Sequence, residues 1–349
     1  MEIKFLNVGC GDGIYIRFLG DDGLFHNVFI DGGTEKGDIY LTTLKKEIKA
    51  LKERNENIDL WIITHIDNDH IGGLLRFIKD KVLFAQIDFT KTRFWFNYSN
   101  WDYDTGIKID NFKSVKQGIT LRNFLNKNAL LSQFITDELQ LVNFYGAKFS
   151  ILSPNRENLE ALIRKWKKAE TKIVEKETSV HKASIQNDYA VKIADFELSE
   201  IELDKSPENA SSIALILEYK NKKILLLADS HPLVLENSLL KLGYTKENKL
   251  SIEYMQVSHH GSKLNTTDGL LELIECNNFV VSGDGYNKYS LPNKKTFARI
   301  IRHNSPKPIR FFITQKNDLT ASIFNVDDGT LNATLEFPMP GSNALVFNL

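Results

Sequence analysis

Alternating apolar and polar residues open the chain and predict a β-rich start. Segments 3–8, 14–18 and 27–30 have strand character, and each is followed by a turn that contains glycine. They predict antiparallel strands joined at glycine-marked corners. From Tyr40 to Arg54, apolar residues recur every three or four positions, which predicts one amphipathic helix with a Lys/Glu outer face.

The next apolar run, Leu60–Ile63, predicts a buried strand that leads into a polar loop at residues 64–70. A second helix is predicted to begin at Ile71. A strand, a polar loop and a helix in succession are a common site geometry in α/β proteins, so this loop is a candidate site.

The second half of the chain repeats the α/β pattern. A helix is predicted before Gly243, at residues 233–242, and strands are predicted at 212–219, 223–227, 254–257 and 279–282. From Ile309 onward, the pattern predicts a hairpin near Asp328-Gly329.

Composition narrows the class of protein. Of the 349 residues, 42% are hydrophobic and 26% charged, and 44 basic residues against 45 acidic ones give a net charge of −1. A globally basic nucleic-acid binder is excluded, although a local basic groove is not. Two cysteines, Cys10 and Cys276, suit a reducing compartment. With no leader-like start and no apolar run of ~20 residues, we expect a cytoplasmic chain that does not enter a membrane.

The densest chemistry lies in the loop after the strand at 60–63, where four potential metal ligands fall within six residues: His65, Asp67, Asp69 and His70. Imidazole nitrogen and carboxylate oxygen suit Zn, Mn or Fe better than a metal that prefers soft ligands. Without a cation, the two carboxylates would repel each other and their desolvation would be costly. The loop therefore predicts a metal site.

Two further elements stand at predicted strand ends. Asp229 follows one strand, and His259-His260 follows another. Taken alone, Asp229 reads as a turn residue or a helix N-cap, and the histidine pair reads as surface or packing. Together with the loop they predict a pair of cations that activates water and clamps an oxyanion or phosphoryl group.

The motif Thr-His-x-Asp-x-Asp-His-x-Gly-Gly at residues 64–73 resembles the signature of the metallo-β-lactamase superfamily. It most resembles the hydrolase domain of the competence protein ComEC, in which the second histidine of the usual motif is an aspartate. Other segments resemble that branch in the same order along the chain: 8–12, 29–33, 151–154, 209–212, 227–229 and 257–263.

This resemblance implies an α/β fold of four layers, a helix–sheet–sheet–helix sandwich with the site at one sheet edge. It implies a single domain over residues 1–349, with insertions at about 95–135 and 155–205. It also implies two divalent cations, Zn or Mn. His65 and Asp67 would bind one cation, Asp69 and His70 the other, and Asp229 would bridge them.

One of His259 and His260 would bind metal, and the other would contact substrate or support a ligand. Asp31 would orient a metal-binding histidine, and Ser262 and Lys263 would meet a substrate phosphate. Asp69, His260 and Lys263 are the candidate catalytic residues. Gly72 and Gly73 would permit close backbone approach beside the metals. His231 is a less favoured candidate for protonating a leaving group. The favoured alternative is that it is an exposed residue at the start of a helix.

The chain departs from the branch pattern at four points. Cys10 replaces a usual Gln, Leu227-Ala228-Asp229 replaces a usual Thr-Gly-Asp, and the histidine that often precedes the Pro of Ser290-Leu291-Pro292 is absent. The histidine of the superfamily's third motif has no counterpart, since His181 lies in a charged stretch and is a poor candidate. One cation would then have fewer protein ligands, or only one would be held firmly.

The function implied is a metal-dependent hydrolase of phosphodiesters, including nucleic acid, with a protein partner left open. Alternatives are a hydrolase of a small-molecule ester (a nucleotide, a phosphocholine-type ester or a thioester) and a silent binding or regulatory module. The aromatic-rich stretch with Phe94, Trp95, Phe96, Trp101 and Tyr103 would either stack bases or pack a small core.

Overall fold

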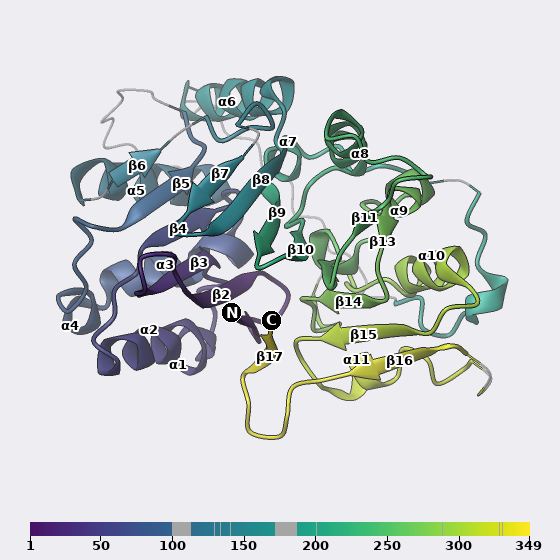
Figure 1. Cartoon of the computed structure of the whole chain (residues 1–349). Coiled ribbons are helices and arrows are strands. Elements are labelled where there is room, and N and C mark those ends of the chain that lie inside the picture. Colours follow the sequence, from purple (N-terminus) through teal and green to yellow (C-terminus); the bar gives the residue numbers. More distant parts are fainter. Residues whose placement is uncertain are drawn as a thin grey trace.

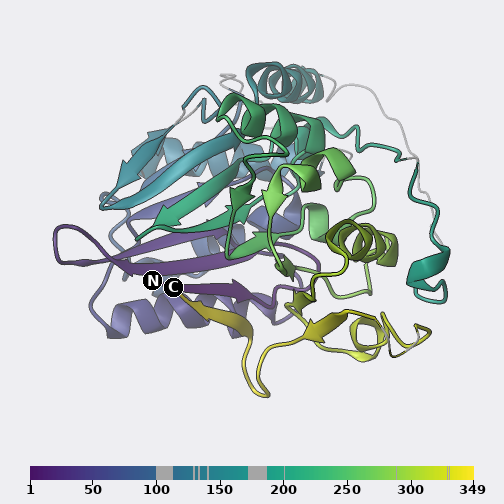
Figure 2. The same ribbon diagram turned by 45° about the vertical axis from the view of Figure 1, so that its right-hand side comes forward.

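Two β-sheets pack face to face in the computed structural model, and helices lie on their outer sides (Figure 1). The N- and C-termini lie side by side (Figure 2), where Met1 and Leu349 exchange two hydrogen bonds of 2.8 Å. The structure describes residues 1–99, 113–128, 130–132, 134–139, 141–171, 187–199, 201–287, 289–327, 329 and 331–349.

Within those residues, one sheet has seven strands and the other has eight. The first has the spatial order β17 (Ala344–Asn348), β1 (Glu2–Leu6), β2 (Gly13–Leu19), β3 (Phe25–Asp31), β4 (Leu60–Ile63), β5 (Arg93–Phe96), β6 (Leu130–Ser132). The second has the order β16 (Ala333–Glu336), β15 (Ile309–Ile313), β14 (Asn278–Val281), β12 (Tyr254–Gln256), β10 (Lys222–Leu226), β9 (Ala214–Tyr219), β8 (Ala147–Ser153), β7 (Val142–Phe144). A short pair joins β11 (Leu250–Ser251) to β13 (Ile274–Glu275).

The helices fall into two groups along the chain. Those of the first half are α1 (Ile39–Thr42), α2 (Leu44–Glu53), α3 (Asn68–Lys79), α4 (Lys81–Phe84), α5 (Lys113–Asn128) and α6 (Arg156–Thr171). Those of the second half are α7 (Pro207–Ala210), α8 (Pro232–Lys241), α9 (Asp268–Glu272), α10 (Lys294–Asn304) and α11 (Asp318–Ala321), with short 3₁₀ turns η1 (Ile193–Asp195) and η2 (His259–Gly261).

The period-2 alternation of side chains along the strands produces the layers. In the first sheet, Phe29 and Trp61 face the core beneath helices α2, α3, α5 and α6, whereas Ile30 and Ile62 face the other sheet. In the second sheet, Ile216 faces the core beneath α8, α9 and α10, and its neighbours on β9 face inward. The four-layered α/β arrangement implied by the family resemblance is confirmed.

In each sheet, the strand directions bring the loops that carry candidate ligands to one end of the strands. β3 runs parallel to β4, and β10 runs parallel to β12. The loops that follow parallel strands lie at the same edge of a sheet. The residues after β4, β10 and β12 are the predicted metal ligands.

Two predicted helices differ in detail. The helix predicted over residues 40–54 is two helices, because Thr43 (φ −119°, ψ −97°) leaves the helical region between α1 and α2. The helix predicted from Ile71 begins at Asn68. The extended backbone of Asp67 caps it, and the carbonyl of Asp67 accepts hydrogen bonds from the backbone of His70 and Ile71.

The aromatic residues of β5 are buried. Phe94 and Phe96 lie in the core beneath the helices, and Trp95 lies between the sheets. Their burial agrees with packing rather than base stacking. Trp101, Tyr103 and His181 lie outside the described residues. Among the helices the structure describes, none is long and apolar enough to cross a bilayer.

Candidate metal centre

The His65–His70 segment joins β4 to the first turn of α3. Its local fold depends on Asp31, the buried last residue of β3, whose φ is +56°. The Asp31 carboxylate accepts hydrogen bonds from the backbone N–H of Thr64 (2.8 Å), from Thr64 Oγ1 (2.6 Å) and from His70 Nδ1 (2.7 Å). One carboxylate thus fixes the end of β3, the end of β4 and the start of α3.

These hydrogen bonds also set the direction of two imidazole rings. His70 donates from Nδ1 to Asp31, and His65 donates from Nδ1 to Thr64 Oγ1 (3.1 Å). In each ring the Nε2 lone pair is then left to face Asp229, as in metal-binding histidines held by a carboxylate or hydroxyl. The sequence predicted this role for Asp31.

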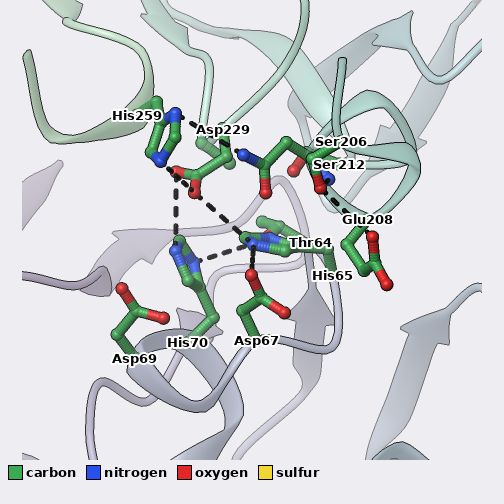
Figure 3. Close-up of polar contacts among 12 residues, drawn as sticks. Thr64, His65, Asp67, Asp69, His70, Ser206, Glu208, Ser212, Asp229 and His259 are labelled. Atoms are coloured by element: carbon green, nitrogen blue, oxygen red, sulfur yellow. Dashed lines mark hydrogen bonds and ion pairs between the residues drawn. The ribbon is translucent and has the colours of Figure 1, made fainter. Parts of the chain in front are cut away.

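Asp229 lies at the centre of the cluster, three residues after β10 ends at Leu226. The residue before it, Ala228, has a φ of +45°. Its Oδ1 is 3.5 Å from His70 Nε2 and 3.5 Å from His260 Nε2. Its Oδ2 is 3.5 Å from His65 Nε2 and 3.7 Å from His259 Nε2. Each oxygen therefore faces a different pair of imidazoles, and Figure 3 shows Asp229 between His259 and the His65–His70 segment.

The two carboxylates of the loop extend these pairs. Asp67 Oδ2 lies 4.0 Å from His65 Nε2, and Asp69 Oδ2 lies 3.5 Å from His260 Nε2. Two sets of donors result. The His65 group comprises His65, Asp67, His259 and Asp229 Oδ2, and the His70 group comprises His70, Asp69, His260 and Asp229 Oδ1.

Both histidines of the pair after β12 point toward Asp229. They lie in η2 with positive φ, 50° for His259 and 54° for His260, a strained conformation for non-glycine residues that tends to occur at functional sites. The sequence assigned one of them to metal and left the choice open. The structure brings both Nε2 atoms to Asp229, one to each oxygen.

Asp204 holds the His259 ring and was not identified from the sequence. His259 Nδ1 lies 3.2 Å from Asp204 Oδ2 and 3.0 Å from Asn265 Oδ1. Asp204 is itself held by Asn209 Nδ2 at 2.7 Å. Burial lowers the pKa of His259, but the carboxylates of Asp229 and Asp204 outweigh it and raise the pKa to about 9. The ring is therefore fixed in an acidic surrounding with Nε2 toward Asp229.

Asp12, in the β1–β2 loop, lies beside His70 and His260. Its oxygens are 3.9 Å from His70 Nδ1 and 3.9 Å from His260 Nδ1. Donor atoms of Asp12, His70, Asp229 and His260 all lie within 4.8 Å of one another, and all four residues are buried. Asp12 lies in the segment 8–12, and nothing in the sequence indicates that its carboxylate would reach these histidines.

The donors fit a pair of divalent cations. Among the described residues, His65 Nε2 of the His65 group and Asp229 Oδ1 of the His70 group are buried without a hydrogen-bond partner, which is costly unless an ion satisfies them. Two ligands on one tetrahedral cation, each ~2.1 Å from it, stand ~3.4 Å apart. The observed Nε2–Nε2 distance between His70 and His260 is 3.3 Å. The distances from Asp229 to the imidazoles are close to this value.

A cavity of about 510 Å³ opens over the cluster, and its walls include Asp67, Asp69, Asp229, His259 and His260. A second hollow shares Asp67 and His259 with it and is lined by Ser262 and Lys263. The predicted phosphate-contacting residues therefore border the site from one side. His231 instead lies behind Asp204, with Nε2 3.7 Å from Asp204 Oδ1.

The glycines after His70 act as the sequence predicted. A Cβ on Gly73 would lie 1.9 Å from the backbone oxygen of Gly32, and a Cβ on Gly72 would lie 2.4 Å from the backbone nitrogen of Glu35. Only glycine lets α3 approach the end of β3 this closely. The close approach brings His70 within reach of Asp31.

A comparison with known protein families supports the expected relation to the metallo-β-lactamase superfamily. The metallo-beta-lactamase superfamily model matches residues 26–82, a stretch that contains β3, β4, α3 and the ligand loop. A comparison with curated proteins finds no match.

Solved structures similar to this chain are distant in sequence. One is the metallo-beta-lactamase fold protein YhfI from Bacillus subtilis, with 11% identity over 99% of this chain and 98% of that chain and a TM-score of 0.42. Another is CmlA, a diiron beta-hydroxylase from Streptomyces venezuelae, with 11% identity over 99% of this chain and 54% of that chain and a TM-score of 0.40. A long form RNase Z from yeast aligns with 11% identity over 82% of this chain and 37% of that chain, with a TM-score of 0.38.

Proposed function

We propose that this chain of the metallo-β-lactamase type is a hydrolase that uses two divalent cations, Zn or Mn, and acts on phosphodiesters. The observation that carries the proposal is the position of Asp229, since each of its two oxygens faces two imidazoles. One imidazole of each pair also faces a carboxylate of the loop, Asp67 or Asp69. Two such cations, when bound, supply a water of lowered pKa and neutralise charge that develops on the substrate.

The chain's own residues would divide the work. The His65 and His70 groups hold the cations, and Asp31 and Asp204 hold two of the ligand rings in place. Asp67 and Asp69 are the partly exposed carboxylates of the set, with side chains 33% and 37% exposed at the cavity, so both are placed to meet an incoming substrate.

Two features support a phosphodiester as the substrate class. The ligand loop resembles the ComEC-type hydrolase domain, in which aspartate replaces the second histidine of the usual motif. In addition, Lys36 lines the cavity over the ligands and Lys263 lines the adjoining hollow, where their ammonium groups would attract a phosphate. Nucleic acid and small phosphodiesters both have this chemistry.

Metal analysis and a substrate screen test the proposal. Protein stripped with chelator and reloaded with Zn or Mn should bind two equivalents and cleave bis-p-nitrophenyl phosphate, and then be compared on single-stranded DNA, duplex DNA, RNA and a thioester. Asp69→Asn should lower diester hydrolysis by at least ~100-fold, since it removes a metal ligand. Asp88→Asn is the matched control, because its side chain is 44% exposed and is not among the residues that line the two hollows.

The outcomes separate the alternatives. Metal content near zero after reloading would overturn the hydrolase proposal in favour of a binding module. Two bound equivalents with thioester but no diester cleavage would keep the metal centre and reject phosphodiesters. Cleavage of nucleic acid that weakens as salt rises would favour a polymer substrate, because phosphate contacts release counterions.

A further inference from the structure

We propose that Cys10 is a ligand of the cation held by the His70 group, so that one of the two cation sites carries a thiolate. The inference rests on the metal binding proposed above, and concerns a residue that the ligand motif does not contain. Cys10 Sγ, a carboxylate oxygen of Asp69 and a ring nitrogen of His260 all lie within 4.8 Å of one another.

That spacing suits a shared cation. On a tetrahedral cation with a Zn–S distance of ~2.3 Å and Zn–N or Zn–O distances of ~2.1 Å, two donors stand ~3.4–3.6 Å apart. Side-chain movements of up to about 1 Å therefore bring all three atoms to one cation. Cys10 also lines the cavity over the cluster together with Asp69 and His260.

The loop that carries Cys10 is fixed against its partner ligand. The backbone N–H of Asp12 donates to the backbone oxygen of Asp69 (3.2 Å), and that of Gly33 donates to the carbonyl of Asp12 (2.7 Å). A Cβ on Gly11 would lie 2.3 Å from the same Asp69 oxygen. The loop is thus packed onto the first turn of α3, and the position of Cys10 relative to Asp69 is set by the backbone.

An independent observation shows an unsatisfied donor on this side of the cluster. Asp229 Oδ1 is buried in a residue only 2% exposed and has no hydrogen-bond partner. This oxygen belongs to the His70 group and lies 3.5 Å from His260 Nε2. A cation in this group would satisfy it, and the thiol of Cys10, within 4.8 Å of donor atoms of Asp69 and His260, would be an additional ligand.

The chemistry of the step is simple ligand exchange. Cys10 Sγ loses its proton to solvent as it binds the cation, and no electron transfer is involved. Thiolate is a soft ligand that selects Zn, whereas carboxylate and water suit Mn. The His70 group would therefore favour Zn, and the His65 group, which has only nitrogen and oxygen donors, would accept Zn or Mn.

Cobalt substitution tests the assignment without relying on activity. Apo-protein loaded with two equivalents of Co²⁺ should show visible d–d bands and an intense near-ultraviolet thiolate-to-cobalt charge-transfer band. Cys10→Ser should abolish the charge-transfer band, keep the d–d bands, and lower the affinity for one of two Zn equivalents by ~10–100-fold. Cys276→Ala is the matched control, since Cys276 lies in the core beneath α8, α9 and α10.

Each outcome has one meaning. Visible bands without a charge-transfer band in the unmodified protein, or a charge-transfer band that persists in Cys10→Ser, would overturn the role of Cys10 and leave the hydrolase proposal standing. Failure to bind Co²⁺ at all would overturn the metal centre itself. Equal thermal unfolding of the apo forms of Cys10→Ser and the unmodified protein excludes misfolding as the cause of a lost band.

Discussion

Two buried carboxylates hold imidazole rings on opposite sides of Asp229. Asp31 accepts from His70 Nδ1, and Asp204 accepts from His259 Nδ1. One ring belongs to each donor group. A partner of this kind fixes the ring and raises its basicity, and its loss commonly lowers metal affinity by ~10–100-fold.

Asp204→Ala should therefore weaken one of the two Zn equivalents by ~10–100-fold and leave the other nearly unchanged. Asp204→Asn, which keeps an oxygen acceptor for His259 Nδ1, should have a smaller effect. Zinc titration against a competing chelator measures both affinities. Asp195→Ala serves as the control, because Asp195 is exposed in η1; equal losses in both variants would contradict a role for Asp204 in holding His259.

At Gly73, the close contact with Gly32 predicts a loss of stability. Gly73→Ala should lower the free energy of unfolding by about 1–3 kcal/mol or more, since the added Cβ would lie 1.9 Å from a backbone oxygen and α3 must shift. Urea unfolding of the apo-protein measures the change. Gly329→Ala, where a Cβ would meet nothing within 4 Å, should change stability little.

Some residues of the site could be predicted from the sequence, and others could not. The His65–His70 loop combines four donors in six residues, so its chemistry can be recognised from the local sequence. Asp204 lies in a stretch dense with charge, and its contact with His259 spans 55 positions along the chain. No local pattern marks such a carboxylate, because its role arises only when distant segments meet.

At the scale of elements, the spacing of apolar residues and the placement of glycines predicted most strands and the helix before Gly243, which is α8. The failures have physical causes. Thr43 breaks the predicted helix at 40–54 although the apolar period continues through it. The predicted hairpin near Asp328-Gly329 is not formed by β15 and β16, which run parallel and have α11 between them along the chain; Asp328 itself lies outside the described residues.

Asp31 links three elements, and its removal should affect them together. Asp31→Ala removes hydrogen bonds to Thr64 and His70, each worth about 1.5–3 kcal/mol when the acceptor is charged, so the apo-protein should unfold at a clearly lower temperature. Calorimetry without metal isolates this effect from metal loss. Unchanged apo stability would contradict a structural role for Asp31.

Across the whole molecule, the two sheets contribute different parts of the centre. The loop after β4 and the start of α3 provide His65, Asp67, Asp69 and His70, while the second sheet provides Asp229, His259 and His260. The cations would therefore connect the two sheets at this edge, in addition to the apolar core between them.

Metal binding should accordingly stabilise the whole fold. At a free Zn concentration of ~100 times the dissociation constant, one site adds ~2.7 kcal/mol to the free energy of unfolding. The unmodified protein should melt at a higher temperature with Zn than with chelator, and Asp229→Asn should lose most of that difference. A shift of equal size in Asp229→Asn would show that Zn binds elsewhere.

The shared carboxylate of Asp229 has one more consequence. Because its oxygens serve both donor groups, occupancy of one group alters the charge left for the other, and by thermodynamic linkage the influence is equal in both directions. The two ions would then not load as independent events. Their binding isotherm would carry a coupling energy, and replacing Asp229 by a side chain with a single oxygen acceptor would abolish that cooperativity as well as lower the affinity.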